Sequence, residues 1–332
     1  MTVEIRTQTV KPVRQTFGHL ARRFGDKPAT RYQEATYDIQ SEVNHHYKPL
    51  WDPERDLYDK RRTALEMADW YALKDPRQYY YGSYTMARAK QQEALERQME
   101  FADRRGLLAQ LPAEAREAIV FALVPLRHYE WGANTNLSHV AAYGWGTAVT
   151  QAAVMGAMDR LGLAQHLSRI GLLVAGNTGA ALDQAHRHWV EHPAWQGLRR
   201  EVENLFVTRD WFEVLVAQTL VADGLLYPLF FQHFDARMAQ RHGPALATVL
   251  DHMNRWQDET ARWVDATVKT AAAESEANRA LIQGWVTHWR GALNGALALL
   301  AEATLGTDGA GALAAADTAL GARLARLGLA SA

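Results

Sequence analysis

The chain contains no cysteine among its 332 residues. Disulfides, thiolate zinc sites, iron–sulfur ligation and a cysteine nucleophile are therefore excluded in this chain. An excess of charge of one sign is also lacking, because 36 Lys and Arg face 37 Asp and Glu, which leaves a formal net charge of −1. This balance argues against a dedicated nucleic-acid binder and against a polybasic membrane anchor. The lack of cysteine fits a reducing compartment, so we expect a cytoplasmic protein.

Uninterrupted apolar stretches are lacking as well. The start of the chain has no apolar run behind a basic patch, so no signal peptide is expected. The most membrane-like stretch, residues 214–231, is interrupted by Gln218, Asp223 and Pro228, which predicts a buried helix and no membrane span. Convincing alternating strands are not found, and neither is a repeat of roughly 20–50 residues. With 48% hydrophobic residues, the chain can still bury a sizeable core.

The first 60 residues show no clear helical pattern. They combine several prolines and many charges with aromatic residues, whereas a disordered tail should be poor in aromatics. Long structureless segments of folded proteins are usually functional or bound to a partner. We therefore expect residues 1–60 to form an extended arm that lies on another chain. The alternative is an arm that packs only on its own domain, and the sequence does not separate the two.

From Arg61 onward the pattern becomes helical, which predicts a second unit, residues 61–332, built as an all-α bundle of long helices. Glycines between Gly162 and Gly179 indicate a connecting region. The helix that begins near Ala180 is expected to stop before Pro193, and Asp210 is a good cap for the next one. The helices are expected at about 63–70, 84–101, 112–139 with a kink at Pro125, 144–161, 180–190, 210–222, 244–272, 276–303 and 312–327.

Asp258 to Arg262 almost spells a metal-binding motif on one of these helices. Di-iron carboxylate bundles take a Glu-x-x-His pair from each of two helices and a single Glu from each of two others. Glu and His three residues apart lie on one helix face, so both reach one ion. Here the residue three positions after Glu259 is Arg262, and a guanidinium has no lone pair to donate.

Two further motifs are weaker candidates for a metal site. His188, Glu191 and His192 have the His-x-x-Glu-His spacing of a zinc hydrolase, which would make the chain an independent helical enzyme. The alternative is a helix end whose histidines favour the negative end of the helix dipole. Glu42 and His45 form the chain's Glu-x-x-His, but they lie in the expected arm, where a solvated turn or a partner contact is favoured.

A block of aromatic residues around Arg77 indicates a subunit interface. Three adjacent tyrosines cannot all face one core, and tyrosine and arginine are enriched among interface anchors. Stacking on nucleic acid is disfavoured because no basic groove accompanies the block. The candidate interface residues are Trp51, Arg77, Tyr79, Tyr80 and Tyr81.

Several longer blocks of the sequence resemble one family. These blocks are Arg14 to Leu20, Asp75 to Gly82, Leu123 to His128, Ser168 to Leu173, Gln196 to Arg200 and Arg209 to Glu213. The resemblance runs from the N-terminus to about Leu329, and it is to the β subunits of bacterial multicomponent di-iron monooxygenases, most closely to those of the phenol hydroxylases. The wider family includes enzymes that act on toluene and methane, and the β subunit of a toluene monooxygenase is the neighbouring alternative.

The resemblance implies a ferritin-like, ribonucleotide-reductase-like bundle in a hydroxylase of paired α, β and γ subunits. The α subunit of such an enzyme holds the di-iron centre and the substrate pocket, and the β subunit is a related bundle without metal. A reductase with FAD and a [2Fe–2S] cluster supplies electrons from NADH, and a small regulatory protein docks on the hydroxylase. The implied reaction inserts one oxygen atom of O2 into an aromatic ring, giving a catechol from a phenol.

Placed on the catalytic pattern of that family, the metal-binding residues of this chain are largely replaced. One motif falls at Arg160 and Leu163, the other at Glu259 and Arg262, and the single carboxylates fall near Glu130 and Leu225. Since neither Leu nor Arg ligates iron, these positions are interpreted as vestigial, with no catalytic or metal-binding residue expected here.

The replaced positions suggest a network of charges. If Glu130 and Glu259 point into the bundle, they need positive charge nearby, which Arg160 and Arg262 could supply as a buried network. The alternative is an exposed pair of Glu259 and Arg262 that contributes little to stability. Changing Arg262 to Met separates the two, because only the buried network predicts a large loss.

Overall fold

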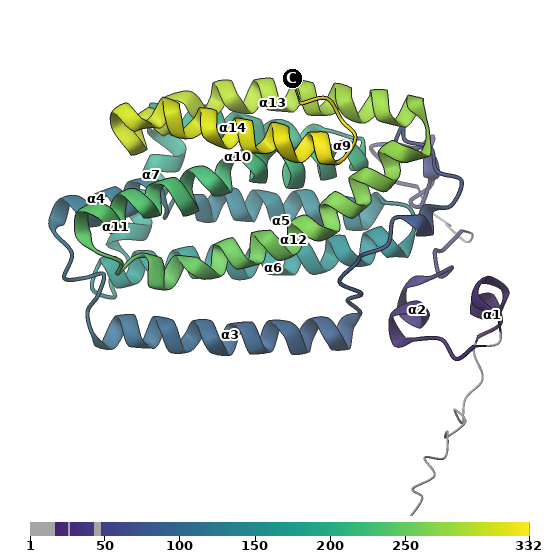
Figure 1. The fold of residues 1–332 in the computed structure, drawn as a ribbon, viewed down its shortest axis with the longest axis horizontal. Coiled ribbons are helices and arrows are strands. Elements are labelled where there is room, and N and C mark those ends of the chain that lie inside the picture. Colours follow the sequence, from purple (N-terminus) through teal and green to yellow (C-terminus); the bar gives the residue numbers. More distant parts are fainter. Residues whose placement is uncertain (1–16, 26, 43–47, 332) are drawn as a thin grey trace, which may run out of the picture.

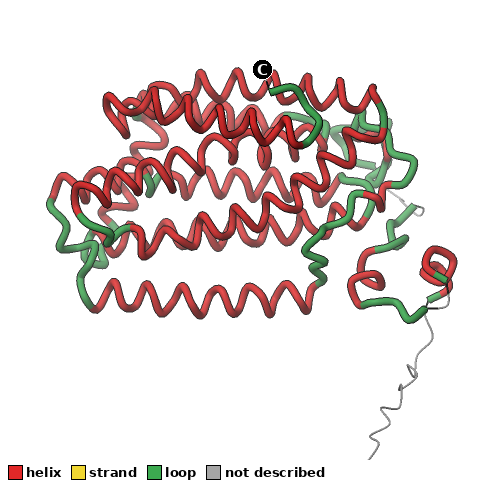
Figure 2. Tube along the Cα trace, viewed as in Figure 1, coloured by secondary structure: helices red, strands yellow, loops and turns green. Residues whose placement is uncertain are grey.

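The computed structural model describes residues 17–25, 27–42 and 48–331. Within this part of the chain all regular secondary structure is helical, as Figure 2 shows, so the predicted all-α bundle of long helices is confirmed. The long helices are α3 (Tyr81–Arg104), α4 (Ala113–Ala122), α5 (Leu126–Tyr143), α6 (Thr147–Val174), α7 (Ala180–Glu191), α8 (Pro193–Val207), α12 (Ala247–Glu274), α13 (Glu276–Leu305) and α14 (Gly309–Arg326). A short turn of 3₁₀-helix, η5 (Gly306–Asp308), joins the last two.

The core of the bundle is one continuous helical run, Trp211–His242. It consists of α9 (Trp211–Leu215), the π-helical segment η3 (Val216–Ala222), α10 (Asp223–Tyr227), a second π-helical segment η4 (Pro228–Phe234) and α11 (Asp235–His242). This run is long and apolar enough to cross a membrane, but 89% of its most apolar window is buried inside the protein. The prediction of a buried helix at residues 214–231 is therefore confirmed.

The helices around this run are arranged in layers (Figure 1). In that view α3 forms the lower edge, α6 and α12 lie above it, and α13 and α14 form the upper edge. Helices α5 and α6 form an antiparallel hairpin and pack closely along their length. The centre of the bundle is therefore enclosed by α5, α6, α10 and α12.

Local signals explain where several helices begin. Asp210 caps the central run, since its carboxylate accepts from the backbone N–H of Phe212 at 2.9 Å and of Glu213 at 3.2 Å. Ser275 caps α13 by accepting from Asn278 N at 3.1 Å. Pro193, expected only to end a helix, is also the first residue of α8, where its missing N–H costs nothing.

Three expectations about the helices were wrong. The segment 63–70 is not an α-helix, because residues 48–80 form loops with two short 3₁₀ turns, η1 (Lys60–Arg62) and η2 (Trp70–Ala72). The connecting region expected at Gly162 is absent, since α6 continues through Gly162 and Gly171 to Val174. At Gly171 a Cβ would approach Leu182 and Val124 to 3.0 Å, so this glycine serves close packing and does not end the helix. No helix was predicted at 193–207, where α8 lies.

The described part of the arm contains two short helices, α1 (Gly18–Phe24) and α2 (Arg31–Thr36). Leu20, Tyr32 and Tyr37 form a small apolar cluster with Tyr71 and with Ala148 of α6. These residues therefore contact their own bundle, as the alternative interpretation of the arm requires. The domain boundary at residue 60 stays a prediction.

Candidate functional site

Arg160 of α6 lies fully buried at the centre of the bundle, between two carboxylates from other helices. Its Nη1 donates to Glu130 Oε2 of α5 at 2.8 Å, and its Nη2 donates to Asp223 Oδ2 of α10. Glu130 and Asp223 are also 0% exposed. We call Arg160, Glu130 and Asp223 the inner cluster. Because a buried charge is tolerated only when it is paired, this cluster fixes three helices around one cation.

Two tyrosines complete the hydrogen bonding of the inner cluster. Tyr227 OH donates to Glu130 Oε1 at 2.8 Å, and Tyr129 OH donates to Asp223 Oδ1 at 2.6 Å. Together with the two bonds from Arg160, these bonds give each of the four carboxylate oxygens a donor. The carboxylates of the cluster are therefore fully hydrogen-bonded in a low-dielectric interior, where leaving one of their oxygens unpaired would be costly.

The π-helical geometry of the central run positions Asp223. Gln218 and Asp223 are five residues apart, yet Gln218 Nε2 donates both to Tyr129 OH at 2.8 Å and to Asp223 Oδ1 at 3.3 Å. A π-helix pairs residue i with residue i+5, so η3 brings these two side chains onto the same face. Asn136 of α5 donates to Gln218 Oε1 at 2.9 Å and ties this face to α5.

The inner cluster contains one guanidinium for two carboxylates, and the pKa values reflect this imbalance. Burial raises the pKa of Glu130, and the nearby positive charge of Arg160 offsets the effect only in part. Burial alone would lower the pKa of Arg160, but the charges of Asp223 and Glu130 raise it well above its ordinary value. Burial also raises the pKa of Tyr129 and Tyr227, so both phenols remain donors.

Trp256 of α12 joins this centre to a second set of charges. The Cζ of Arg160 lies 4.5 Å from the centroid of the Trp256 ring, a cation–π contact. On the other side the indole Nε1–H donates to Asp159 Oδ2 at 2.9 Å. Asp159 and Arg160 are consecutive residues of α6, so one indole contacts two neighbouring side chains that carry opposite charges.

The second set, which we call the outer cluster, consists of Arg88 of α3, Asp159 of α6 and Glu259 of α12. Arg88 Nη2 lies 2.7 Å from Asp159 Oδ2 and 2.9 Å from Glu259 Oε1. The side chains of Arg88, Asp159 and Glu259 are 16%, 6% and 17% exposed. Burial alone would raise the pKa of Glu259, but the hydrogen bonds and charge of Arg88 lower it below its ordinary value. The outer cluster therefore attaches α3 to the bundle by paired charges near the surface.

The structure brings together some of the predicted positions and separates others. Glu130 and Arg160 pair at the centre, and Leu163 is buried one turn further along α6. Glu259 belongs to the outer cluster, where Arg88 and, at 3.6 Å, Arg77 provide the positive charge. Arg262 is exposed. The prediction that Arg262 joins a buried network is therefore wrong, and so is the alternative of an exposed Glu259–Arg262 pair.

The sequence analysis missed two residues of the centre. Asp223 supplies the carboxylate that was expected near Leu225, two positions later in the chain. Its signal was present, because Asp223 is the one acidic residue in the apolar stretch 214–231. Helix α12 presents Trp256 to the centre, three residues before the expected Glu259. Both errors are errors of register along a helix.

The side chains at the centre do not provide the ligands of a di-iron site. A guanidinium has no lone pair, and Arg160 fills the space between the two carboxylates that converge there. The remaining groups are phenols and amides and include no imidazole. Among residues 17–25, 27–42 and 48–331, no group of three or more His, Cys, Asp or Glu is arranged to hold a metal.

The residues of the weaker metal motifs have other contacts. His192 Nδ1 accepts from Ala194 N at 3.2 Å and so caps α8, while Glu191 is the exposed last residue of α7. The His188 and His192 rings lie 5.2 and 5.0 Å from the ring of Phe121. Burial lowers the pKa of His188. Glu42 is exposed, and His45 lies outside the described residues.

The candidate interface residues differ in their exposure. Tyr81 is 74% exposed and Trp51 is 49% exposed, so both remain available to a partner. Tyr79 and Tyr80 are half-buried. The side chain of Arg77 is only 7% exposed and binds Asp75 at 2.9 Å, so it serves an internal ion pair. The role of these residues at an interface stays a prediction.

A larger apolar surface lies on α5, α6 and the end of α8. On α6, Val154, Met158 and Leu161 follow helical spacing and are 46%, 44% and 45% exposed. Trp131 of α5 is 56% exposed and contacts Phe206 of α8 edge-to-face at 6.3 Å. Asn134 Nδ2 of α5 donates to Ala157 O of α6 at 2.7 Å and so ties the two helices together next to Met158 in the sequence. We call the set the apolar face, and it consists of Trp131, Val154, Met158, Leu161, Phe206 and Val207.

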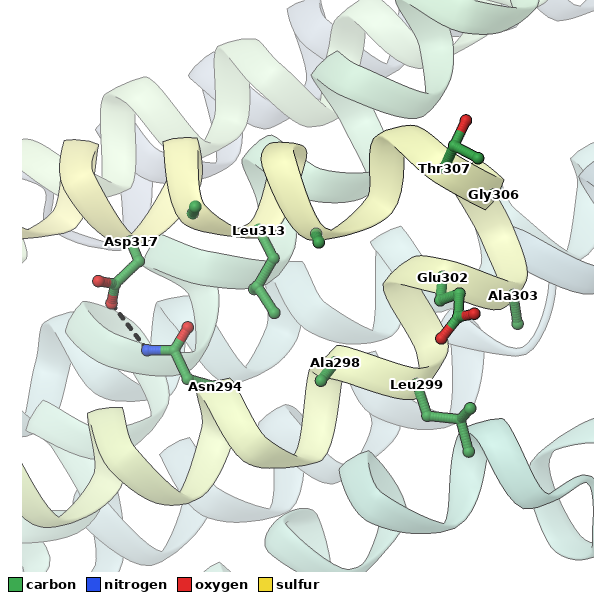
Figure 3. Close-up of a pocket in the computed structure, with 11 residues that line it drawn as sticks. Asn294, Ala298, Leu299, Glu302, Ala303, Gly306, Thr307, Leu313 and Asp317 are labelled. Atoms are coloured by element: carbon green, nitrogen blue, oxygen red, sulfur yellow. Dashed lines mark hydrogen bonds between the residues drawn. The ribbon is translucent and has the colours of Figure 1, made fainter.

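A groove of about 1150 Å³ lies between α13 and α14 (Figure 3). Its lining is mostly alanine and leucine, with Asn294 and Asp317 facing each other across one end. Asn294 Nδ2 donates to Asp317 Oδ1 at 2.7 Å, and Arg290 also binds this carboxylate at 2.7 Å. Hydrogen bonds from Arg290 lower the pKa of Asp317, so the groove offers no unpaired group for chemistry at this end.

Comparisons with known proteins agree with one another. The family model described as methane/phenol/alkene hydroxylase matches residues 51–275. The phenol 2-monooxygenase oxygenase component DmpL of Pseudomonas sp. strain CF600 is 51% identical over 331 residues, which cover 100% of this chain and 99% of that protein. The corresponding component MhpL of Acinetobacter pittii strain PHEA-2 is 44% identical over 329 residues, covering 99% and 98%.

Two solved structures share the fold. A chain of phenol hydroxylase from Pseudomonas sp. OX1, solved under xenon pressure, superposes with a TM-score of 0.93 at 45% identity and covers 98% of this chain and 99% of that one. A chain of toluene 4-monooxygenase gives a TM-score of 0.74 at 21% identity, covering 92% and 99%. The second likeness shows the shared fold alone.

Proposed function

Because the chain belongs to the methane/phenol/alkene hydroxylase family, we propose that it is the β-type subunit of the oxygenase component of a phenol monooxygenase. The observation that carries this proposal is the similarity to phenol 2-monooxygenase oxygenase components along the whole length of the chain. The assembled enzyme would hydroxylate phenols to catechols with O2 and electrons from NADH. We expect it to work in the cytoplasm.

The role proposed for this subunit is structural. The centre of its bundle holds Arg160, Glu130 and Asp223, which stabilise the fold and leave no open position for substrate or oxygen. The di-iron centre and the substrate pocket would then belong to a partner α subunit, and FAD and the [2Fe–2S] cluster to a partner reductase. The remaining proposed partners are a γ subunit and a small regulatory protein.

The apolar face is the surface proposed to dock the larger subunit. Between Glu130 and Asp159 the sequence contains no Asp, Glu, Lys or Arg, so the exposed side of residues 131–158 carries none of these charged side chains. Contiguous exposed apolar surface marks interaction sites, and Trp, Met and Phe are enriched in the cores of interfaces. The exposed Trp51 and Tyr81 are proposed to extend this interface.

Co-expression with candidate partner chains tests the proposed function. We expect this chain to co-purify in stoichiometric complex with a larger, iron-containing chain, and the complex to hydroxylate phenol when the reductase and NADH are added. A chain that remains monomeric in the presence of its encoded neighbours would contradict the proposal. Hydroxylation of phenol at an unchanged rate by the larger chain alone would contradict the supporting role.

A matched pair of substitutions tests the apolar face. Met158→Glu places a charge in the middle of the face and should weaken assembly at least tenfold, because a buried unpaired carboxylate is costly. Met86→Glu is the control, since Met86 lies on α3, outside the face, and is 67% exposed. Binding measured by titration of the purified partner should change little for Met86→Glu. Equal affinities for the two variants would show that the subunit docks elsewhere.

The arm is tested by truncation. Deleting residues 1–45 should weaken assembly more than it lowers the unfolding midpoint of the bundle, if part of the arm lies on the partner. The small cluster of Leu20, Tyr32 and Tyr37 would be lost in the same deletion, so a modest loss of stability is expected as well. A truncated chain with unchanged affinity for the complex would show that the arm serves only its own subunit.

A further inference from the structure

Arg127 of α5 stands at the edge of the apolar face. It lies four residues before Trp131, and residues four apart are neighbours on the same side of a helix. Trp131 is 56% exposed, whereas Arg127 is half-buried. Because residues 131–158 carry no Asp, Glu, Lys or Arg, Arg127 places a positive charge beside an otherwise uncharged surface.

The guanidinium of Arg127 has few hydrogen-bond acceptors in its own chain. Nη2 donates to Leu182 O of α7 at 3.2 Å, Nε is buried without a partner, and Nη1, which is not enclosed, bonds to no described residue. In the part of the chain that the structure describes, Arg127 forms no ion pair, and the exposed Asp183 attracts it only from a greater distance. Burial lowers the pKa of Arg127, and the attraction of Asp183 offsets only part of this effect. The free chain therefore holds a partly desolvated cation without a paired carboxylate.

His128, the next residue, adds no charge at this end of α5. Burial lowers the pKa of His128 to about 4, and the charge of Arg127 acts in the same direction, so the imidazole is neutral at pH 7. The ring stacks on Trp189 of α7 with 5.8 Å between centroids, and its Nε2 is buried without a hydrogen-bond partner. The charge beside the apolar face at this end of α5 is therefore that of Arg127.

We propose that Arg127 binds a carboxylate of the larger subunit when that subunit covers the apolar face. The inference rests on the proposed function, because it assigns one contact within the docking surface proposed above. Docking would remove the remaining water from the guanidinium, and a buried charge is tolerated only when it is paired. An Asp or Glu of the partner can supply that pairing at Nη1, the nitrogen that is not enclosed. Arginine is also enriched among the interface residues that contribute most to binding.

The experiment compares binding with stability in the full chain. Affinity is measured by titration with the purified larger, iron-containing chain, and the unfolding midpoint is measured without that chain. Arg127→Met removes the charge and keeps a side chain of similar length. We expect its affinity to fall about tenfold to a hundredfold, the equivalent of losing a hydrogen bond to a charged group. Its unfolding midpoint should stay the same or rise, because the free chain no longer carries an unpaired, partly buried cation.

Two further variants separate the charge from its position. Arg127→Lys keeps the positive charge but loses the planar fork of the guanidinium, so its affinity should lie between those of the wild type and Arg127→Met. Arg262→Met is the matched control, because Arg262 is exposed on α12, outside the apolar face. Both its affinity and its unfolding midpoint should stay close to the wild-type values. A loss of affinity in Arg127→Met that Arg127→Lys partly restores therefore supports a contact with a negatively charged group.

The other outcomes overturn the proposal. If Arg127→Met lowered the affinity and the unfolding midpoint together, Arg127 would serve its own fold through Leu182 O. If Arg127→Lys and Arg127→Met lost affinity equally, the charge would not be what the partner binds. An unchanged affinity for Arg127→Met, with Met158→Glu still impaired, would reject this contact and leave the docking surface in place. A wild-type chain that binds no larger chain would reject the proposed function as well, so the two failures are distinguishable.

Discussion

The inner and outer clusters have the same composition but lie in different surroundings. Each contains one arginine between two carboxylates, and the consecutive residues Asp159 and Arg160 place them on different faces of α6. The inner cluster is 0% exposed, whereas the side chains of the outer cluster are 6–17% exposed. The comparison therefore isolates the effect of burial on a three-membered set of charges.

Burial reverses the sign of one electrostatic effect. In the outer cluster, the charge and hydrogen bonds of Arg88 outweigh burial, so the pKa of Glu259 falls below its ordinary value of 4.5. In the inner cluster, burial outweighs the charge of Arg160, so the pKa of Glu130 rises above the same value. Near the surface, pairing with an arginine is therefore enough to favour the charged form of the carboxylate. At the buried centre, pairing with an arginine offsets only part of the cost of burying the charge.

The largest expected effect follows removal of the inner arginine. Arg160→Met leaves two carboxylates in the core without a cation, and breaking a buried ion pair in this way costs about 3–5 kcal/mol. Arg88→Met should cost less, about 1.5–3 kcal/mol, the range for hydrogen bonds to charged groups. Urea unfolding of the two variants measures the difference. Equal losses would show that burial does not separate the clusters.

A triple substitution sharpens the same comparison. Replacing Glu130, Arg160 and Asp223 together by Gln, Met and Asn removes every charge of the inner cluster but keeps similar side-chain volumes. Since uncharged replacements of buried ion pairs are often neutral or stabilising, most of the loss seen in Arg160→Met should be recovered. If the triple variant were as unstable as Arg160→Met, the loss of stability in Arg160→Met would come from altered packing and not from unpaired charge.

The next effect concerns the residue that joins the clusters. Trp256→Phe keeps an aromatic ring beside Arg160 but removes the N–H that binds Asp159, with an expected loss of about 1–2 kcal/mol. Combined with Arg88→Met, it should show a coupling free energy of about 0.5–1 kcal/mol, because both residues bind the same carboxylate. Trp289→Phe is the control, since its N–H binds Glu213 at 2.9 Å and shares no partner with Arg88. If the losses were additive both for Trp256→Phe with Arg88→Met and for Trp289→Phe with Arg88→Met, Trp256 would not couple the two clusters.

The pH dependence should have opposite signs in the two clusters. The folded pKa of Glu259 is lowered, so its contribution to stability is present above pH 4.5 and is lost as the pH falls through the folded value. The folded pKa of Glu130 is raised, so its contribution is present below pH 4.5 and is lost as the pH rises through the folded value. We compare the free energy of unfolding of the wild type with that of each variant. The advantage of the wild type over Glu259→Gln should therefore grow as the pH rises, and its advantage over Glu130→Gln should shrink. Urea unfolding between about pH 3 and 7 covers both windows, and slopes of the same sign for the two differences would contradict the comparison.

How far the sequence predicted the site depended on helix register. Glu130 and Arg160 lie on regular α-helices, where a spacing of 3.6 residues per turn holds, and the family resemblance picked out both positions. Asp223 lies between two π-helical segments, which the ordinary period does not anticipate, and the resemblance expected this carboxylate two residues later, near Leu225. Glu259 matched the first position of a Glu-x-x-His motif. However, the apolar side of α12, which faces the core, contains Trp256 and not Glu259. Helix α8 was missed because a proline can begin a helix as well as end one.

The smallest change in stability is expected for Arg262, the residue that follows Glu259 in the near match to a metal-binding motif. Arg262 follows Glu259 by three residues on α12, yet both oxygens of Glu259 already accept hydrogen bonds from Arg88, and Gln91 binds one of them at 3.1 Å. Arg262 is exposed, so Arg262→Met should change the free energy of unfolding by no more than about 0.5 kcal/mol. Arg77→Met is the matched control and should cost more, because Arg77 is buried against Asp75 and lies 3.6 Å from Glu259. If Arg262→Met instead cost as much as Arg88→Met, Glu259 would depend on its own helix for charge, and the outer cluster would have to be redefined around Arg262.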